Sequence, residues 1–166
     1  MNKAKYYIDK LGLIKHPEGG WYKEVYKSDE IIKKEHLPER FGGERRHSTS
    51  IYFLLKCGEC SAFHRIKSDE LWHFYDGDAV TIHMIDSGGK YSSAKLGRDL
   101  DSGEVLQFTV PHSTWFAAEV EKPGSFALAG CTVSPGFHFD DFEIGEREEL
   151  IRLYPKYKDI ILKFKR

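Results

Sequence analysis

The feature that most constrains the fold is a series of short β-type segments that fills most of the chain from residue 48 onward. Each segment is rich in β-branched and aromatic residues, and Gly, Asp or Ser residues bound it. An aromatic-rich segment of the same kind follows the turn signal Pro17-Glu18-Gly19-Gly20. The strands expected from this pattern span residues 21–26, 49–55, 60–66, 70–75, 79–85, 105–110, 115–120 and 125–133. Short strands at regular spacing favour a sandwich or barrel, so the sequence predicts an all-β fold.

Helices are expected only towards the two ends. Asn2 can cap a helix over residues 2–11, and Gly12 supplies its stop. Residues 145–153 and 158–164 have helical patterns, and Pro155 separates them. The charged, glycine-punctuated stretch 28–47 reads as a long surface loop or flap. With 166 residues and no internal repeat, one domain over 1–166 is the expected organisation.

Composition excludes several classes of partner. The net charge is −1 and the isoelectric point is about 6.7, so no overall field favours nucleic acid. The sequence has no apolar run of about 18 residues, so no membrane segment is expected. The chain has three cysteines, an odd number, which argues against a disulfide framework. This favours a reducing, cytoplasmic location. The aromatic content of 14% suits a β-sheet core or a pocket for a small-molecule ligand.

The spacing of one histidine and one glutamate indicates a candidate functional site. Gly58 is followed after five residues by His64, then after five by Glu70, and after six by Gly77. Because side chains alternate along a strand, His64 shares a face with Ile66, and Glu70 shares one with Trp72. A turn between the two strands can bring His64 close to Glu70. Such a pair can ligate a cation or supply a tuned base, although it can also be an ordinary buried histidine with a hydrogen-bonded carboxylate.

This stretch resembles the first signature of the cupin superfamily, Gly-x5-His-x-His-x3-4-Glu-x6-Gly, except that Ile66 stands at the second histidine. The second signature aligns with Pro111, but Ser113 replaces its second glycine and Phe116 replaces its ligand histidine. Of the four usual metal ligands, only His64 and Glu70 remain. The resemblance therefore implies a site most simply without a cofactor. A divalent metal stays possible if His73, which has the wrong strand parity, is re-aimed by a bulge.

Further stretches resemble one uncharacterised cupin family that is often labelled predicted sugar epimerases. The matching segments are residues 13–24, 48–55, 63–74, 131–137 and 140–143. The resemblance implies the cupin double-stranded β-helix, a jelly roll, and a homodimer in which Trp21 and Tyr26 can pack at the interface. A more distant similarity to enzymes that epimerise dTDP-4-keto-6-deoxy sugars implies His64 as general base. Glu70 or Asp141 would then orient it, while the tyrosine acid, Tyr52 or Tyr75, stays unassigned.

The resemblance and strand parity also suggest which side chains would contact a ligand around His64 and Glu70. They are Tyr22, Thr49, Tyr52, Trp72, Gln107, Trp115 and Phe139. The Cys57-x-x-Cys60 pair spans a β-turn and is expected to be structural rather than redox-active. The other histidines without ligand spacing are expected at the surface: His16, His36, His47 and His83.

Three functions remain open on these grounds. The first is a metal-independent epimerase or isomerase of a carbonyl-containing sugar with His64 as base. The second is a ligand-binding cupin without catalysis. The third is a metal-dependent enzyme that uses His64, Glu70 and a non-standard third ligand such as His73.

Overall fold

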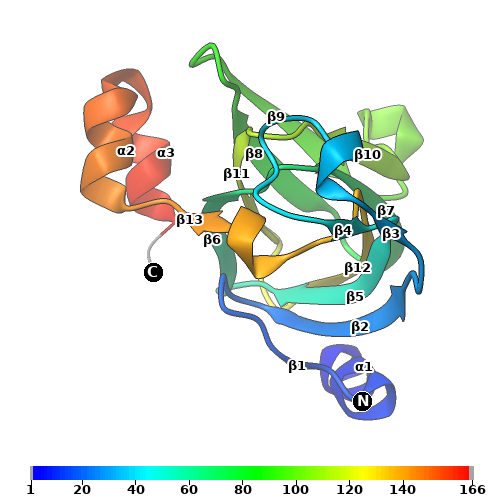
Figure 1. The fold of residues 1–166 in the computed structure, drawn as a ribbon. Helices are drawn as coiled ribbons and strands as arrows, with labels where there is room; N and C mark the ends of the chain where they lie inside the picture. The colour runs from blue at the N-terminus through cyan, green and yellow to red at the C-terminus, as the bar shows by residue number, and fades with distance from the viewer. Residues whose placement is uncertain (1, 165–166) are drawn as a thin grey trace.

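The computed structural model describes residues 2–164 and shows two facing β-sheets with helices near both ends of the chain (Figure 1). The strands are β1 (Ile14–Lys15), β2 (Trp21–Lys27), β3 (Ile31–Ile32), β4 (Arg45–Arg46), β5 (Thr49–Lys56), β6 (Cys60–Arg65), β7 (Asp69–Gly77), β8 (Val80–Ile85), β9 (Tyr91–Leu96), β10 (Gln107–Val110), β11 (Trp115–Glu119), β12 (Phe126–Ser134) and β13 (Glu143–Ile144). The α-helices are α1 (Lys3–Leu11), α2 (Arg147–Leu153) and α3 (Lys158–Lys163), and the 3-10 turns are η1 (Lys34–His36), η2 (Leu100–Ser102), η3 (Phe139–Asp141) and η4 (Pro155–Tyr157).

The strands form a jelly roll. One sheet has the order β1-β2-β5-β12-β7-β10, and the facing sheet has the order β13-β6-β11-β8-β9. The named strands pair antiparallel, and consecutive strands such as β6 and β7 lie in different sheets. The segment between β6 and β7 therefore crosses from one sheet to the other and does not form a hairpin. The predicted all-β jelly roll is confirmed.

Alternation along the strands builds the core between the sheets. Trp72 of β7, Ile82 of β8 and Phe116 of β11 are almost fully buried there, together with residues from β5 and β12. Burying each such side chain stabilises the fold by about 1.5–3 kcal/mol. Phe53 and Trp72 of this core also line a cavity between the sheets.

Helices cover parts of the outer sheet faces (Figure 1). Helix α1 begins at its predicted cap, where the Asn2 Oδ1 accepts a hydrogen bond from the Lys5 N–H at 3.1 Å. It ends at Gly12, which has a φ of 66°. Residues of α1 pack on Leu54 and Leu128, while α2 and α3 pack on the opposite sheet. The predicted helices at both ends are confirmed.

Several parts of the chain differ from the sequence-based expectation, including the short strands β1 and β13, which were not expected. Strand β9 was missed because it is an edge strand whose side chains are mostly solvent-exposed, so it lacks an apolar alternation. The stretch 28–47 is not simply a surface loop, because β3 and β4 pair within it. Phe41 and Arg45 of this stretch are buried at 1% and 4% exposure, and they anchor it to the barrel.

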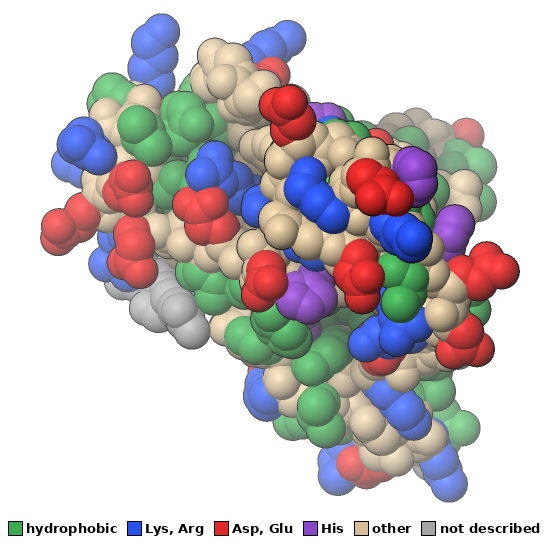
Figure 2. Space-filling view, viewed as in Figure 1, with side chains coloured by type: hydrophobic (Ala, Val, Ile, Leu, Met, Phe, Trp, Pro, Cys, Tyr) green, Lys and Arg blue, Asp and Glu red, His purple; other side chains and the backbone are tan. Residues whose placement is uncertain are grey.

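The molecular surface carries mixed charge. Figure 2 shows basic and acidic side chains interspersed over the visible face, without a broad patch of one sign. Within residues 2–164, no helix is long and apolar enough to cross a membrane.

A glycine between β1 and β2 sets how closely this segment approaches β6. Gly19 has a φ of 115°, and a Cβ atom there would lie 2.0 Å from the backbone oxygen of Cys60. We expect Gly19→Ala to lower the free energy of unfolding by about 3 kcal/mol or more, because the clash is with backbone that cannot rotate away. Urea unfolding at neutral pH measures this.

The matched control is Gly58→Ala. Gly58 has a φ of 85° but open space around its Cβ position, so its substitution should cost only about 1 kcal/mol of backbone strain. Equal losses in the two variants would show that the close approach at Gly19 does not matter.

Candidate functional site

A cavity of about 230 Å³ lies between the two sheets, at the end where the β1–β2 segment and η3 approach the barrel. Its walls combine aromatic rings with a small number of ionisable groups, which is typical of small-molecule sites. The lining residues are His16, Glu18, Tyr22, Glu24, Thr49, Ile51, Phe53, His64, Ile66, Glu70, Trp72, Cys131, Val133, Phe137, Phe139 and Phe142.

His64 is held at both ring nitrogens. Its Nδ1–H donates to the carbonyl oxygen of Ala62 at 2.8 Å, and its Nε2 lies 3.0 Å from the Glu18 Oε2. The His64 and Glu18 side chains are only 3% and 7% exposed. The ring also lies against Phe116, with a centroid separation of 4.0 Å. These contacts fix the orientation of the imidazole.

The backbone brings Glu18 to His64. The amide of Ala62 donates to the carbonyl oxygen of Glu18 at 2.9 Å, which joins the β1–β2 segment to β6. The Ser61 hydroxyl donates to the Glu18 Oε1 at 2.9 Å. The glycine at position 19 permits this approach, because any side chain there would strike β6. The Pro17–Gly20 turn thus delivers a carboxylate to the cavity.

The buried pair is charged. Burial alone would raise the pKa of Glu18, but His64 outweighs it and holds that pKa below its usual value. Burial likewise would lower the pKa of His64, and the Glu18 carboxylate raises it instead. The attraction between the two groups therefore favours their charged forms, an imidazolium and a carboxylate. Burial lowers the pKa of the neighbouring His16, whose Nδ1 accepts from the Glu18 N–H at 3.3 Å, so His16 is neutral there.

Glu70 is a further titratable group in the cavity, and the Glu18–His64 pair affects its pKa. Burial, and then the charge of Glu18, raises the pKa of Glu70 to about 7. His64 and a hydrogen bond from the Cys131 thiol act in the opposite direction. A carboxyl group that titrates near neutral pH can both accept and return a proton.

Six of the residues predicted for the site line the cavity. They are His64, Glu70, Tyr22, Thr49, Trp72 and Phe139. The strand-parity argument that placed His64 and Ile66 on one face, and Glu70 and Trp72 on another, agrees with this arrangement. His64 and Glu70 face each other from opposite sheets.

Several other predicted side chains lie away from the cavity, so their placement is corrected. Tyr52 points to the opposite face of β5 from Ile51 and Phe53, and it contacts Tyr75, the other acid candidate, there. His73 lies on the outer sheet surface with Gln107, whose Nε2 is 2.7 Å from the His73 Nδ1. The pairing of β7 with β10 is continuous from Glu70 to His73, so no bulge turns the His73 side chain toward the cavity.

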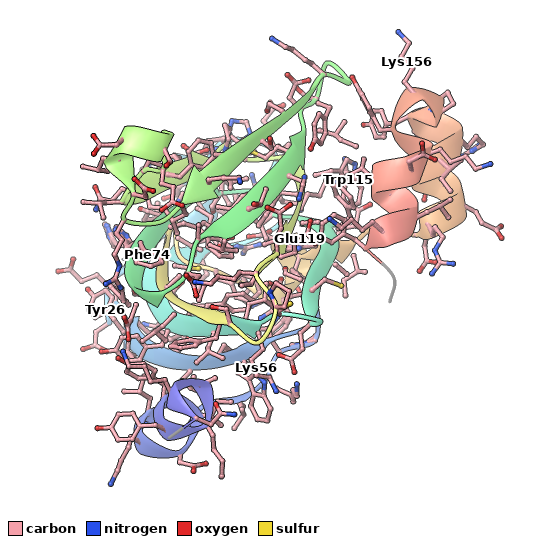
Figure 3. The ribbon with its side chains drawn as sticks, turned by 180° about the vertical axis from the view of Figure 1, so that it is seen from behind. Tyr26, Lys56, Phe74, Trp115, Glu119 and Lys156 are labelled. Carbon is pink, nitrogen blue, oxygen red and sulfur yellow. The ribbon has the colours of Figure 1, made fainter. Side chains whose placement is uncertain are left out.

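Trp115 is also displaced from the cavity. It packs beneath α2 and α3 on the outer side of its sheet, and Figure 3 shows it on the side of the barrel that faces these helices. Strand β11 turns Phe116 inward, and alternation therefore directs Trp115 outward.

Asp141 does not touch His64 but anchors the cavity mouth. Both of its carboxylate oxygens accept hydrogen bonds from the Arg45 guanidinium at 2.6 Å, and both side chains are 3% exposed. This bidentate pair joins β4 to η3, the turn that carries Phe139. The carboxylate that orients His64 is Glu18.

Sequence reasoning missed Glu18 and His16. The Pro17-Glu18-Gly19-Gly20 segment was interpreted as turn chemistry alone, and no ligand spacing connects it to His64. The glycine pair after an acidic residue was the available signal. The prediction that His16 and His83 lie at the surface is wrong: the His16 side chain is 9% exposed, and His83 is 7% exposed in a network with Glu119 and Tyr91.

The side chains do not fit a metal of the kind that cupin signatures provide for. Ile66 and Phe116 occupy two of the four usual ligand positions, and Phe116 is fully buried against the His64 ring. The remaining His64 uses its Nε2 for Glu18. Among residues 2–164, no group of three His, Cys, Asp or Glu residues could hold a metal ion. No step below depends on a metal.

The Arg45–Asp141 pair should contribute strongly to stability. We expect Asp141→Asn to lower the free energy of unfolding by about 2–4 kcal/mol, because it leaves the buried guanidinium without its counter-charge. Glu143→Gln is the control: Glu143 pairs with Arg65 at 2.8 Å, but its side chain is 52% exposed, so the loss should stay below about 1 kcal/mol. Chemical denaturation of both variants tests this, and similar losses would contradict it.

Glu70 should make stability depend on pH. Its pKa rises from an ordinary 4.5 when unfolded to about 7 when folded, so the folded state holds the proton more tightly. Its contribution to stability is therefore greatest below about pH 4.5 and is lost as the pH rises to about 7. Relative to the wild type, Glu70→Gln should gain on the order of 3 kcal/mol across this interval. A difference that stays constant with pH in denaturation curves would contradict the raised pKa.

Comparisons with known proteins agree on one family. The model of the cupin superfamily (DUF985) matches residues 5–145. The uncharacterized protein YML079W of Saccharomyces cerevisiae is 31% identical over 152 residues, which cover 85% of this chain and 75% of the yeast protein. Protein SO0799 of Shewanella oneidensis, known from a crystal structure, is 40% identical with a TM-score of 0.88, covering 100% of this chain and 98% of that one. A hypothetical protein from Leishmania major is 34% identical with a TM-score of 0.88, covering 96% of this chain and 97% of its own. The chain therefore belongs to the cupin superfamily (DUF985).

Proposed function

We propose that this cupin binds a small carbonyl-containing sugar or related molecule and moves a proton at the carbon next to its carbonyl group, as an isomerase or epimerase does. The observation that carries the proposal is the buried Glu70 carboxyl group, which lines the cavity and has a pKa of about 7. A base with this pKa is half ionised at neutral pH, where it can both remove and return a proton.

Glu70 suits the role of base better than His64. Both ring nitrogens of His64 are already engaged, by the Ala62 carbonyl and by Glu18. A histidine in this state has no free lone pair with which to remove a proton from a substrate. His64 instead supplies a fixed positive charge beside Glu70, and Glu18 keeps it protonated.

The proposed step conserves protons. The Glu70 carboxylate takes the proton from the carbon, the electron pair of the broken C–H bond moves toward the carbonyl oxygen, and an enediolate forms. The imidazolium of His64 stabilises this negative charge electrostatically. Return of the proton from Glu70 to the former carbonyl carbon, with transfer of the hydroxyl proton on the adjacent oxygen to the former carbonyl oxygen, completes an isomerisation. For an epimerisation, Tyr22 is the cavity tyrosine that can donate its own proton to the opposite face of the original carbon. Glu70 then keeps the proton that it removed, and proton exchange with water restores both groups.

Solvent exchange tests the proposal directly. Free aldoses and ketoses are incubated with the protein in deuterium oxide, and NMR follows deuterium incorporation next to the carbonyl group. We expect exchange by the wild type and a loss of about 100-fold or more in Glu70→Gln, the usual range for removing a general base. The ionised form is the active one, so kcat/KM should rise with pH through an inflection near 7.

Glu149→Gln is the control, because Glu149 is exposed on α2 and does not line the cavity. It should exchange at the wild-type rate. Exchange by Glu70→Gln at the wild-type rate would reject the assignment of the base. Compounds that raise the melting temperature without any exchange would favour the alternative, a cupin that binds its ligand without turnover.

A further inference from the structure

We propose that the cavity selects an uncharged, monosaccharide-sized carbonyl compound and rejects phosphate esters, nucleotide sugars and sugar acids. This inference rests on the proposed function for the reaction, but it concerns binding and is tested separately. It departs from the resemblance to dTDP-sugar epimerases, whose substrates carry a diphosphate.

The charges in the cavity wall are the main argument. The lining contains three glutamates, Glu18, Glu24 and Glu70, but no lysine or arginine among the described residues. Proteins recognise phosphate and carboxylate groups mainly through arginine and lysine. The one imidazolium, His64, is already paired with Glu18. An anionic ligand would thus enter beside carboxylates and find no free cation.

An arginine that pairs with the turn carrying Phe139 is committed elsewhere. The Arg45 guanidinium lies behind the cavity mouth, and it donates hydrogen bonds to both carboxylate oxygens of Asp141. Lys67 also lies 3.7 Å from an oxygen of Asp141. A phosphate at the mouth would have to compete with a buried, bidentate ion pair for these groups.

A cationic ligand is not favoured either. The charges of Glu18 and His64 cancel, and Glu70 is half protonated at neutral pH. Glu24 lies at the exposed end of the lining, on the outer part of β2. The interior is therefore close to neutral overall, which suits an uncharged molecule.

The size of the cavity sets a second limit. A volume of 230 Å³ equals that of about eight waters at about 30 Å³ each. Covalently linked atoms occupy less space than separate waters, so a ligand of about a dozen non-hydrogen atoms fits, the size of a hexose. Sites for larger ligands typically measure about 300–1,000 Å³.

The wall chemistry suits a polyhydroxylated ring. Phe53, Phe142 and Trp72 offer flat apolar surfaces, while Glu18 and Glu70 offer oxygens that accept from hydroxyl groups. The indole Nε1–H of Trp72 is buried and has no hydrogen-bond acceptor among the described residues.

Binding of matched probes tests the inference without requiring turnover. The panel consists of glucose, fructose, xylose and ribulose, with glucose 6-phosphate, fructose 6-phosphate and glucuronate as charged counterparts. Isothermal calorimetry and thermal shift measure each against the wild-type protein. We expect at least one uncharged sugar to bind, and its charged counterpart to bind at least about tenfold more weakly. Equal or tighter binding of a charged counterpart, or no binding by any uncharged sugar, would overturn the inference.

A charge reversal at the cavity mouth sharpens the test. Glu24→Lys should shift the ratio of affinities toward the phosphorylated sugar by about tenfold at low salt, and added salt should reduce this shift. Glu149→Lys makes the same change of charge on α2, away from the cavity, and should leave the ratio unchanged. An equal shift in both variants would overturn the role of the cavity charges.

The two proposals fail in different ways. An uncharged sugar that binds without deuterium exchange would contradict the proposed reaction and support the ligand class. Exchange on a phosphorylated sugar, lost in Glu70→Gln, would support the reaction and overturn the ligand class.

Discussion

The buried ion pair between Glu18 and His64 is the interaction on which the cavity depends. It connects the segment before β2 to β6 of the facing sheet, and a backbone hydrogen bond from Ala62 to Glu18 reinforces it. Removing one partner of such a pair leaves an uncompensated buried charge, which costs about 3–5 kcal/mol. The close approach it needs is possible only because position 19 has no side chain. The Pro17–Gly20 turn, strand β6 and the Glu18–His64 ion pair therefore depend on one another structurally.

This unit also determines how Glu70 behaves. The carboxylate of Glu18 disfavours a second negative charge nearby, and burial acts in the same direction. Above neutral pH the folded protein holds a charged Glu70 at a cost in stability. Groups that cost stability in this way cluster at functional sites, where the raised pKa serves proton transfer. The loss of folding stability caused by burying Glu70 is thus consistent with a catalytic role.

Apolar side chains stand at two of the usual ligand positions in this cupin. Where the family signatures place metal ligands, Ile66 lines the cavity and Phe116 is fully buried against the imidazole. An aromatic ring against one face of His64 keeps water away and strengthens its pairing with Glu18. The turn before β11 retains the backbone of the signature, since Ser113 adopts a φ of 61° at the position of the second glycine. The scaffold is preserved while the chemistry of its centre changes.

The sequence by itself determined the succession of short strands, the terminal helices, and the strand faces that His64 shares with Ile66 and Glu70 shares with Trp72. These follow from local periodicity, from turn residues and from the spacing of one motif, all of which act over a few residues. Tertiary structure alone decided that Glu18 meets His64, 46 positions apart along the chain by residue number. It also decided that Asp141 belongs to Arg45, and that Tyr52 and Trp115 face outward. Such contacts join distant segments across two sheets, and strand parity cannot reveal which side of a sheet is the inner one.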